Sequence, residues 1–256
     1  MANSIQPPLD PLGSPRPTRV RWLVFAMAGL TSYINYVHRY SWGVIRPFLL
    51  DQEIVTSNQA GWLDGLFGLT YGLGQFPGGL MGDLMGPRTI IPVVAVLWSC
   101  VTAAPAIVSN LWGLAGVRLG MGLTQAAAYP NLGNISQRWF PRSVRTSMQG
   151  FVSSFAGRAG AACSPLIIAS LLMGLCGLSW QWALAVTAVT GFVFAAVFYL
   201  LFRNSPREHP WANVAEAELI EKGEVVESDK QRVRFDWSPR NISNLLFFFG
   251  ASFSST

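Results

Sequence analysis

The stretch WLVFAMAGLTSYINYVHRYSWGVIRP, residues 22–47, decides what kind of protein this is. It is long enough to cross a membrane, which takes about 20 mostly apolar residues in a helix. Yet it places His38 and Arg39 side by side, where a membrane span is normally apolar. Because a charged side chain at membrane depth is costly, it is usually retained for a function. The stretch therefore predicts a membrane helix that carries a functional charge.

The composition of the 256-residue chain also indicates a membrane protein. Hydrophobic residues make up 51% of it and charged residues only 12%, against about 25% charged residues in soluble domains. The three cysteines lie in apolar segments without metal-binding spacing, and the sequence has no Gly-rich phosphate loop. We therefore expect no enzyme, no metal site and no cofactor. His209 lies in a charged segment, where we expect it to be solvated.

Six apolar segments have the length of membrane-spanning helices. They cover residues 22–47, 59–82, 88–108, 111–136, 145–175 and 180–202. The predicted fold class is an all-α integral membrane protein. We divide the chain into a disordered leader (1–20), a six-helix bundle (21–202), a linker (203–240) and the start of a seventh membrane helix (241–256). Within the linker, residues 211–224 could form a short amphipathic helix.

The basic residues predict the orientation of these spans. Most of the 18 Lys and Arg residues lie before span one, between spans two and three, between spans four and five, or after span six. Loops on the cytoplasmic side of membrane proteins are enriched in Lys and Arg. We therefore expect the leader and the linker to be cytoplasmic in a protein of the plasma or inner membrane. The formal net charge of +5 then reflects this topology, and no nucleic-acid partner is expected.

Charged residues inside the predicted spans are mostly basic. Arg39, Arg118 and Arg158 fall within spans, whereas Asp64 is the one acidic residue well inside a span. A buried cation needs a counter-charge. We interpret the shortage of acids as a sign that a bound anionic substrate is the missing partner. The alternative is that these arginines reach toward the membrane surface or bond to backbone carbonyls.

Polar residues recur at helical spacing in two of the spans. In span one they are Ser32, Asn35, Arg39, Trp42 and Arg46. In span four they are Arg118, Gly122, Gln125 and Tyr129. Two such faces directed at each other would line a polar cavity. Tyr36 and His38 lie on either side of the Arg39 face and could reach its edge.

The segment GGLMGDLMGPRTII, residues 78–91, resembles the loop signature between helices two and three of the major facilitator superfamily. The match is carried by Gly79, Asp83, Gly86 and Arg88, whereas Leu84 replaces a residue that is usually basic. In that family the loop helps to control gating. Asp83 is expected to pair with Arg88 or with a helix N-terminus.

A second segment, RLGMGLTQAAAYPNLGNISQRWFPRSVRTSMQG at 118–150, is similar to span four of the anion:cation symporter branch of that superfamily. This branch includes bacterial hexonate and hexuronate carriers and sialin relatives. INYVHR (34–39) and NSPREHPWANVAEAELI (204–220) resemble the same branch. The resemblance implies a secondary transporter for a small organic anion, in which two six-helix halves rock around a central site. Because the chain ends inside its seventh apolar segment, we interpret it as an N-terminal fragment that lacks the second half.

These observations assign provisional roles in substrate binding. Arg39 is expected to hold the anionic group of a sugar acid or carboxylate, because Arg pairs with carboxylates through two parallel hydrogen bonds. Asn35, Tyr36, Gln125 and Tyr129 are expected to orient the substrate. The other expected partners are the lipid bilayer, protons and the missing C-terminal half.

Two departures from the branch concern proton coupling. The branch usually has an acidic residue at position 38 and Glu at position 125, where this chain has His38 and Gln125. Coupling would then depend on His38 or Asp64, or be absent.

Other readings of the same residues stay open. The organophosphate:phosphate antiporters, a sister branch, resemble the chain at Tyr36, Arg39 and Pro47 and again at Gln125 and Pro130. An exchanger of that kind is therefore one alternative. The others are a membrane sensor or scaffold that does not transport, and a fragment without function.

Overall fold

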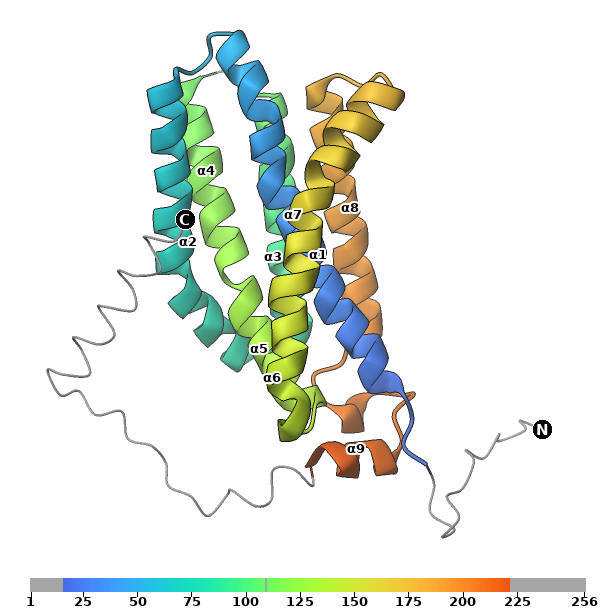
Figure 1. Ribbon diagram of the computed structural model, residues 1–256. Helices are drawn as coiled ribbons and strands as arrows, with labels where there is room; N and C mark the ends of the chain where they lie inside the picture. Colours follow the sequence, from blue (N-terminus) through green and yellow to red (C-terminus); the bar gives the residue numbers. More distant parts are fainter. Residues whose placement is uncertain (1–15, 109, 222–256) are drawn as a thin grey trace, which may run out of the picture. The chain divides into compact units, whose positions relative to one another are not determined.

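The computed structural model describes residues 16–108 and 110–221, and all regular secondary structure in these ranges is helical, as predicted (Figure 1). The α-helices are α1 (Val20–Asp51), α2 (Ser57–Met85), α3 (Pro87–Ala103), α4 (Leu111–Ala126), α5 (Ala128–Trp139), α6 (Arg142–Gly150), α7 (Gly157–Pro165), α8 (Trp180–Leu201) and α9 (Val214–Glu221). Short 3₁₀ segments are η1 (Ala104–Ala106) and η4 (Pro206–Glu208), and π-helical segments are η2 (Phe151–Ala156) and η3 (Leu166–Leu175). Most of the predicted leader and the predicted seventh helix lie outside the described residues.

These helices coincide with the six predicted apolar segments. Spans one, two and six are the single helices α1, α2 and α8, and span three is α3 continued by η1. Span five runs through α6, η2, α7 and η3. Span four is divided at Ala127 into α4 and α5. The division has a local cause, because Pro130 has no N–H to donate to the carbonyl of Ala126, four residues earlier.

Three of the described helical segments are long and apolar enough to cross a membrane by length and composition alone. They are Pro87–Ala106, Arg142–Leu175 and Trp180–Leu201. The other three predicted spans are the ones that carry Arg39, Asp64 and Arg118.

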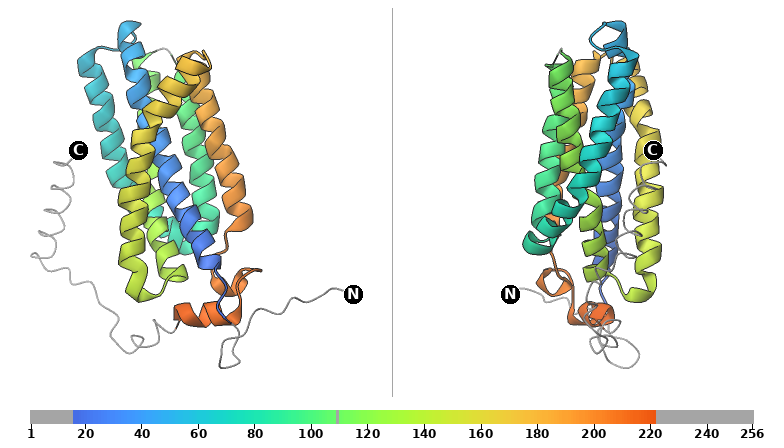
Figure 2. Two further views of the ribbon diagram at one scale, coloured as in Figure 1. Left: turned by 45° about the vertical axis from the view of Figure 1, so that its right-hand side comes forward. Right: turned by 90° about the vertical axis from the view of Figure 1, so that its left-hand side faces the viewer.

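The helices pack chiefly in three pairs, α2 with α4, α3 with α8, and α1 with α7. Helix α1 also contacts α3, α5 and α8, and two turned views show it among the other helices (Figure 2). The pair α2–α4 approaches closely through small residues, which let helix backbones come together inside a membrane. Gly74, Gly78 and Gly82 recur every four residues on α2, and a Cβ added at Gly78 would lie 2.6 Å from the Cα of Ala127.

The buried apolar residues form two separate clusters along α1. One contains Val20, Val24, Met27 and Ala28 near the start of α1, and the other contains Trp42, Ile45 and Leu49 toward its end. Between them lie the buried polar residues Thr31, Ser32, Asn35, His38 and Ser41, which we call the polar belt. Buried polar groups cost free energy unless they are hydrogen-bonded, so a cluster of them is usually kept for a function. The polar belt is therefore the first candidate for a binding site.

The described part of the linker packs against the start of α1. Glu216 on α9 is fully buried and accepts hydrogen bonds from the backbone N–H groups of Val20 (3.3 Å) and Arg21 (3.0 Å), and from the hydroxyl of Thr18. A carboxylate at this position stabilises the free N–H groups and the dipole at the first turn of a helix. Helix α9 itself lies within the segment 211–224, where a helix was predicted.

The expectation of a solvated His209 was wrong. Its side chain is buried, with Nε2 donating to the carbonyl of Leu201 (3.0 Å) and Nδ1 accepting from the N–H of Trp211 (3.2 Å). Its ring also meets the ring of Trp139 edge to face, at 5.6 Å between centroids. Burial lowers the pKa of His209 below its usual value, because the charged form loses its hydration.

Candidate functional site

The polar faces of α1 and α4 are directed at each other, as the helical spacing predicted. Arg39 Nε donates to Gln125 Oε1 at 3.0 Å, and Gln125 Nε2 donates to the backbone carbonyl of Asn35 at 3.0 Å. Gln125 is fully buried. Its amide therefore joins the two helices and fixes the Arg39 guanidinium beside the polar belt.

Three aromatic rings surround the Arg39 guanidinium. Its central carbon lies 4.9 Å from the ring centre of Tyr36, 5.2 Å from that of Phe67 and 4.4 Å from that of Tyr71. The electron-rich face of an aromatic ring attracts a cation. Phe67 and Tyr71, both on α2, were not among the site residues predicted from the sequence. A signal was present, because Asp64, Phe67 and Tyr71 step by three and four and so share one face of a helix.

Several buried polar atoms at this place have no hydrogen-bond partner. They are Arg39 Nη2 and both polar side-chain atoms of Asn35, whose side chain is fully buried. Within residues 16–108 and 110–221, no carboxylate pairs with Arg39. A buried group without a partner is costly, so it usually has a functional explanation. The arrangement presents one cation and one amide to an anion with oxygen atoms.

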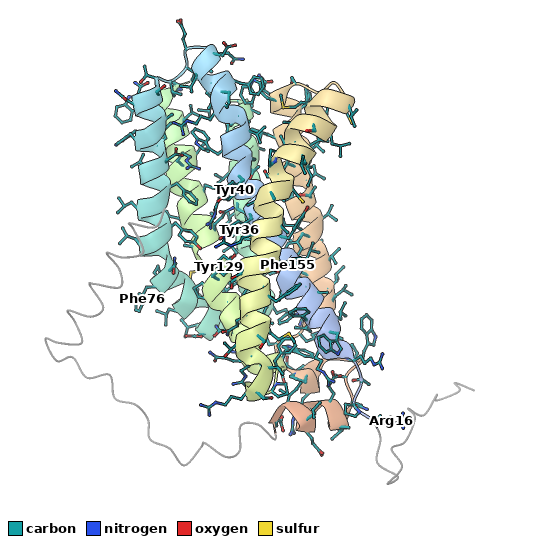
Figure 3. All side chains as sticks on the ribbon, in the orientation of Figure 1. Arg16, Tyr36, Tyr40, Phe76, Tyr129 and Phe155 are labelled. Atoms are coloured by element: carbon teal, nitrogen blue, oxygen red, sulfur yellow. The ribbon has the colours of Figure 1, made fainter. Side chains whose placement is uncertain are left out.

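Tyr129 lies next to this site on α5. Its hydroxyl is 2.9 Å from the hydroxyl of Ser32, and its ring meets the ring of Tyr36 edge to face at 6.2 Å. Figure 3 shows Tyr36 and Tyr129 close together between the helices. Helix α7 approaches both through Gly157, where an added Cβ would lie 3.0 Å from the Tyr129 hydroxyl. Of the four residues predicted to orient the substrate, Tyr36 and Gln125 contact Arg39 directly. Asn35 is linked to it through Gln125, and Tyr129 through Tyr36.

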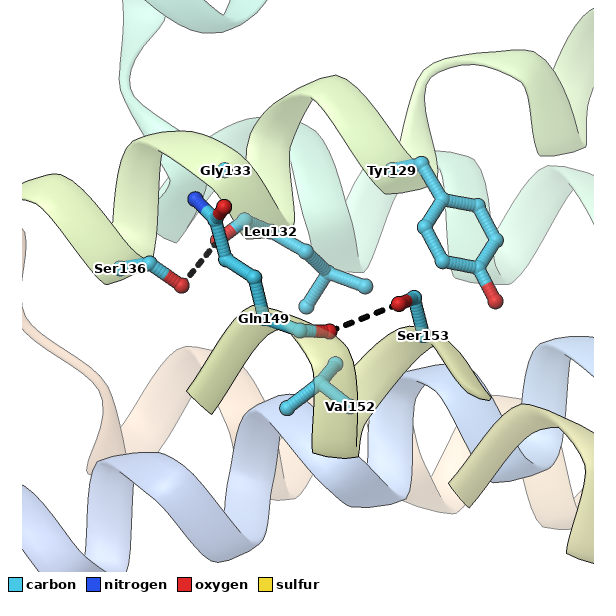
Figure 4. A pocket seen from close by; sticks show the side chains of 7 residues that line it. All are labelled: Tyr129, Leu132, Gly133, Ser136, Gln149, Val152 and Ser153. Atoms are coloured by element: carbon cyan, nitrogen blue, oxygen red, sulfur yellow. Dashed lines mark hydrogen bonds between the residues drawn. The ribbon is translucent and has the colours of Figure 1, made fainter. Parts of the chain in front are cut away.

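A pocket of about 240 Å³ adjoins Tyr129, between α5 and the start of span five (Figure 4). Its lining is uncharged and mostly apolar, and its polar groups come from Tyr129, Ser136, Gln149 and Ser153. The Ser136 and Ser153 hydroxyls each donate to a backbone carbonyl four residues earlier, of Leu132 and Gln149, which leaves their oxygen lone pairs free. The pocket therefore offers hydrogen-bond partners to neutral hydroxyl groups.

Asp64 lies on the same face of α2 as Phe67 and Tyr71, and it forms a second charged group with two arginines. Its Oδ1 accepts from Arg118 Nη2 at 2.7 Å, and its Oδ2 accepts from Arg46 Nη1 at 3.2 Å. Arg118 also donates to the carbonyl of Leu63 at 3.3 Å and lies 4.7 Å from the ring centre of Phe67. Arg118 thus has an internal counter-charge, whereas Arg39 has none among the described residues.

His38 does not reach the edge of the Arg39 site, contrary to expectation. Its ring nitrogens lie 3.0 Å from the hydroxyl of Thr102 on α3 and 3.3 Å from that of Thr190 on α8. The side chain is fully buried on a different face of α1 from Arg39, beside Trp98. One residue along a helix corresponds to a rotation of about 100°, so adjacent residues face different neighbours.

The loop between α2 and α3 is a tight turn at Gly86, which has a positive φ of 80°. An added Cβ there would lie 2.5 Å from the side chain of Asn204, which accepts a hydrogen bond from the N–H of Arg88. The predicted pair of Asp83 with Arg88 is not formed. Asp83 instead accepts from Asn134 on α5 at 2.9 Å, and Arg88 lies against the Tyr199 ring on α8.

The remaining residues of interest lie apart from this site. Arg158 is exposed on α7, on the same helical face as the exposed Ser154 and Ala162. Gly79 on α2 faces Pro130, with an added Cβ 3.3 Å from the proline ring. In the ranges that the structure describes, no group of three His, Cys, Asp or Glu side chains is placed to hold a metal ion.

Comparisons with known proteins agree with this architecture. The family model of the Major Facilitator Superfamily matches residues 21–256. A bacterial homologue of the human lysosomal transporter Spinster, solved in an inward-facing and unoccupied conformation, superposes with a TM-score of 0.64 at 20% identity. The match covers 75% of this chain and 45% of that chain. At this identity it supports the fold alone.

Curated relatives include transporters of sugar acids. The chain is 29% identical over 213 residues to a D-galactonate transporter of Escherichia coli O6:H1, covering 83% of this chain and 48% of that protein. It is 30% identical over 214 residues to a probable galactarate/D-glucarate transporter of Bacillus subtilis, covering 80% and 46%. It is 24% identical to a hexuronate transporter of Escherichia coli K12, again covering 80% and 46%. The chain spans about half the length of the curated relatives it matches.

Proposed function

Because the chain belongs to the Major Facilitator Superfamily, we propose that it forms the N-terminal half of a transporter for a small sugar-acid anion. A second six-helix half would complete the central site, and alternation between inward-open and outward-open arrangements would carry the anion across the membrane. In this proposal the leader, the α2–α3 loop with Gly79, Asp83, Gly86 and Arg88, and the linker lie on the cytoplasmic side. The loop then acts in gating.

The proposal rests on Arg39, a cation that still has an unused hydrogen-bond donor. Its guanidinium is held by Gln125 and three aromatic rings, and its Nη2 atom is buried without a partner. A carboxylate would accept from Arg39 and from the free Asn35 amide at the same time, which satisfies both groups. The charge of the bound anion would also offset the cost of a guanidinium at membrane depth.

The surroundings of Arg39 favour a polyhydroxylated acid. Tyr36 borders the guanidinium, Tyr129 lies against Tyr36, and the uncharged pocket with its polar groups begins at Tyr129. With its carboxylate on Arg39, a sugar acid could direct its hydroxyl groups toward these acceptors and donors. The relatives named above transport sugar acids according to their names, which favours this class over the phosphate esters of the antiporter alternative.

Uptake into membrane vesicles by the protein from the whole reading frame tests the role of Arg39. We expect Arg39→Lys and Arg39→Ala each to lower the uptake of radiolabelled D-galactonate by about tenfold or more, because a hydrogen bond to a charged group is lost. Arg138→Lys is the matched control, since Arg138 is exposed in the last turn of α5. Wild-type uptake by the Arg39 variants at equal membrane abundance would remove Arg39 from the site.

The same vesicles distinguish the antiporter alternative. Sugar-acid uptake that needs no phosphate on the opposite side supports the proposed class. Exchange of phosphate esters for phosphate, without sugar-acid uptake, would replace it.

A further inference from the structure

We propose that Asp64 restricts the substrate to acids with one carboxylate group, by occupying the second cationic position of the site. This inference rests on the proposed sugar-acid function. It concerns a choice that the relatives leave open, since one is named for the monoacid D-galactonate and another for the diacids galactarate and D-glucarate.

Two arginines border the same aromatic ring. The guanidinium carbons of Arg39 and Arg118 lie 5.2 Å and 4.7 Å from the ring centre of Phe67, so their separation cannot exceed the sum of these distances. A six-carbon diacid is long enough to direct a carboxylate toward each of them. On positive charge alone, the site would suit an aldaric acid.

Asp64 changes that outcome, because it already pairs with Arg118. The Asp64–Arg118 contact of 2.7 Å is the shorter of its two ion pairs, and the Arg118 side chain is only 7% exposed. Asp64 is thus placed where the second carboxylate of a diacid would bind. An incoming second carboxylate would meet the like charge of Asp64, and repulsion against the wrong ligand is an effective source of specificity.

Arg39 is in the opposite situation. Among the described residues it has no acidic partner, and its bonded neighbour, Gln125, is a neutral amide. Of the three arginines near this site, Arg39 is thus the one without an acidic partner in the described residues, whereas Arg118 and Arg46 share Asp64. Because the Arg46 side chain is 39% exposed, solvent screens its charge more than that of the buried Arg118. This distribution of charge suits a monoacid such as an aldonate or a uronate. Arg46 adds a second contact to Asp64 at 3.2 Å, which helps to hold the carboxylate in place.

Galactonate and galactarate provide a matched pair of probes, because they share a carbon skeleton and differ in the oxidation of one terminal carbon. The experiment measures how each acid competes for counterflow of labelled galactonate by the protein from the whole reading frame. We expect wild type to prefer galactonate. In Asp64→Asn, Arg118 is released, and the affinity for galactarate relative to galactonate should rise by about tenfold or more.

Two further variants keep the test decisive. Asp64→Glu retains the carboxylate and should retain the preference of wild type. Asp64→Asn combined with Arg118→Gln removes both members of the buried pair, so it avoids an uncompensated buried charge and should lose the gain in galactarate affinity.

The possible failures are distinct. If wild type exchanges neither acid, the proposed function is wrong, and the inference about Asp64 is wrong with it. If wild type exchanges both acids equally well, or if Asp64→Asn exchanges galactonate with an unchanged preference, only the role of Asp64 is overturned. If Asp64→Asn does not reach the membrane, the double variant of Asp64→Asn with Arg118→Gln provides the test. A stronger preference of this double variant for galactarate than that of wild type would contradict the inference.

Discussion

At position 39, the guanidinium meets an amide and three aromatic rings, whereas at position 118 it meets a carboxylate. The two arginines therefore differ in what they can bind, although both lie in helices of the same bundle. Arg118 is neutralised within the chain, and Arg39 retains a free hydrogen-bond donor. This difference between single residues is the physical basis for assigning the anion to Arg39.

The two candidates for proton coupling, His38 and Asp64, also have different surroundings. His38 is fully buried between α1, α3 and α8, with threonine hydroxyls at both ring nitrogens. The Asp64 side chain is 38% exposed and lies on the same face of α2 as Phe67 and Tyr71. A group that exchanges protons with water needs access to it. We therefore expect that Asp64, and not His38, couples transport to protons.

Uptake driven by an imposed pH gradient checks this prediction. Asp64→Asn should lose accumulation above equilibrium but retain counterflow, since a neutral amide carries no proton. His38→Gln should retain both activities. Accumulation that survives in Asp64→Asn, or that is lost only in His38→Gln, would contradict the assignment.

At the scale of elements, the close packing of α2 on α4 and α5 positions the site. Helix α2 contributes Asp64, Phe67 and Tyr71, and three glycines along it lie against Ala126, Ala127 and Asn131. The amide of Asn131 is fully buried and donates to the carbonyl of Gly78 at 3.1 Å. Without this approach, the aromatic rings of α2 would not reach the arginines of α1 and α4.

Substitution of Gly78 tests the importance of this packing. An added Cβ would overlap the backbone of Ala127, so Gly78→Ala should lower the free energy of unfolding by about 1–3 kcal/mol, as overpacking does. Gly68→Ala in the same helix is the control, because nothing lies within 4 Å of a Cβ there. Thermal denaturation in detergent should show a lower midpoint for Gly78→Ala only. Equal midpoints for the two variants would mean that α2 can shift without cost.

At the scale of the whole described chain, the start of α1 and the linker come together although they are almost 200 residues apart in sequence. Glu216 and Asn213 bond to residues 16–21, and His209 is buried among aromatic rings at the end of α8. Figure 1 shows α9 lying across the end of the bundle beneath α1. These contacts tie the beginning of span one to the end of span six.

The burial of His209 makes this attachment sensitive to pH. Its pKa is lower in the folded protein than the value of about 6.5 in an unfolded chain. The stability that it contributes is therefore present in full above about pH 6.5 and is lost progressively as the pH falls below it. Protonation would also remove the acceptor for the N–H of Trp211.

Hydrogen–deuterium exchange of residues 203–213 measures this effect. Wild type should be better protected than His209→Gln at pH 7.5, and the difference should shrink as the pH falls to 5.5. The comparison at each pH removes the intrinsic pH dependence of exchange. A difference that stays constant between pH 7.5 and 5.5 would show that His209 does not titrate in this way.

Apolar length and a period of 3.6 residues are local properties of a chain, so the helices and the polar face of each could be predicted without the structure. Residues 22–47 are helical as predicted, and the helix predicted at 180–202 extends from Trp180 to Leu201. Which polar residues contact one another became clear only from the folded arrangement. It placed His38 against α3 and α8, joined Asp83 to Asn134, and brought Phe67 and Tyr71 to Arg39. The physical reason is that these contacts depend on the rotation and approach of neighbouring helices, which residues distant in sequence set together.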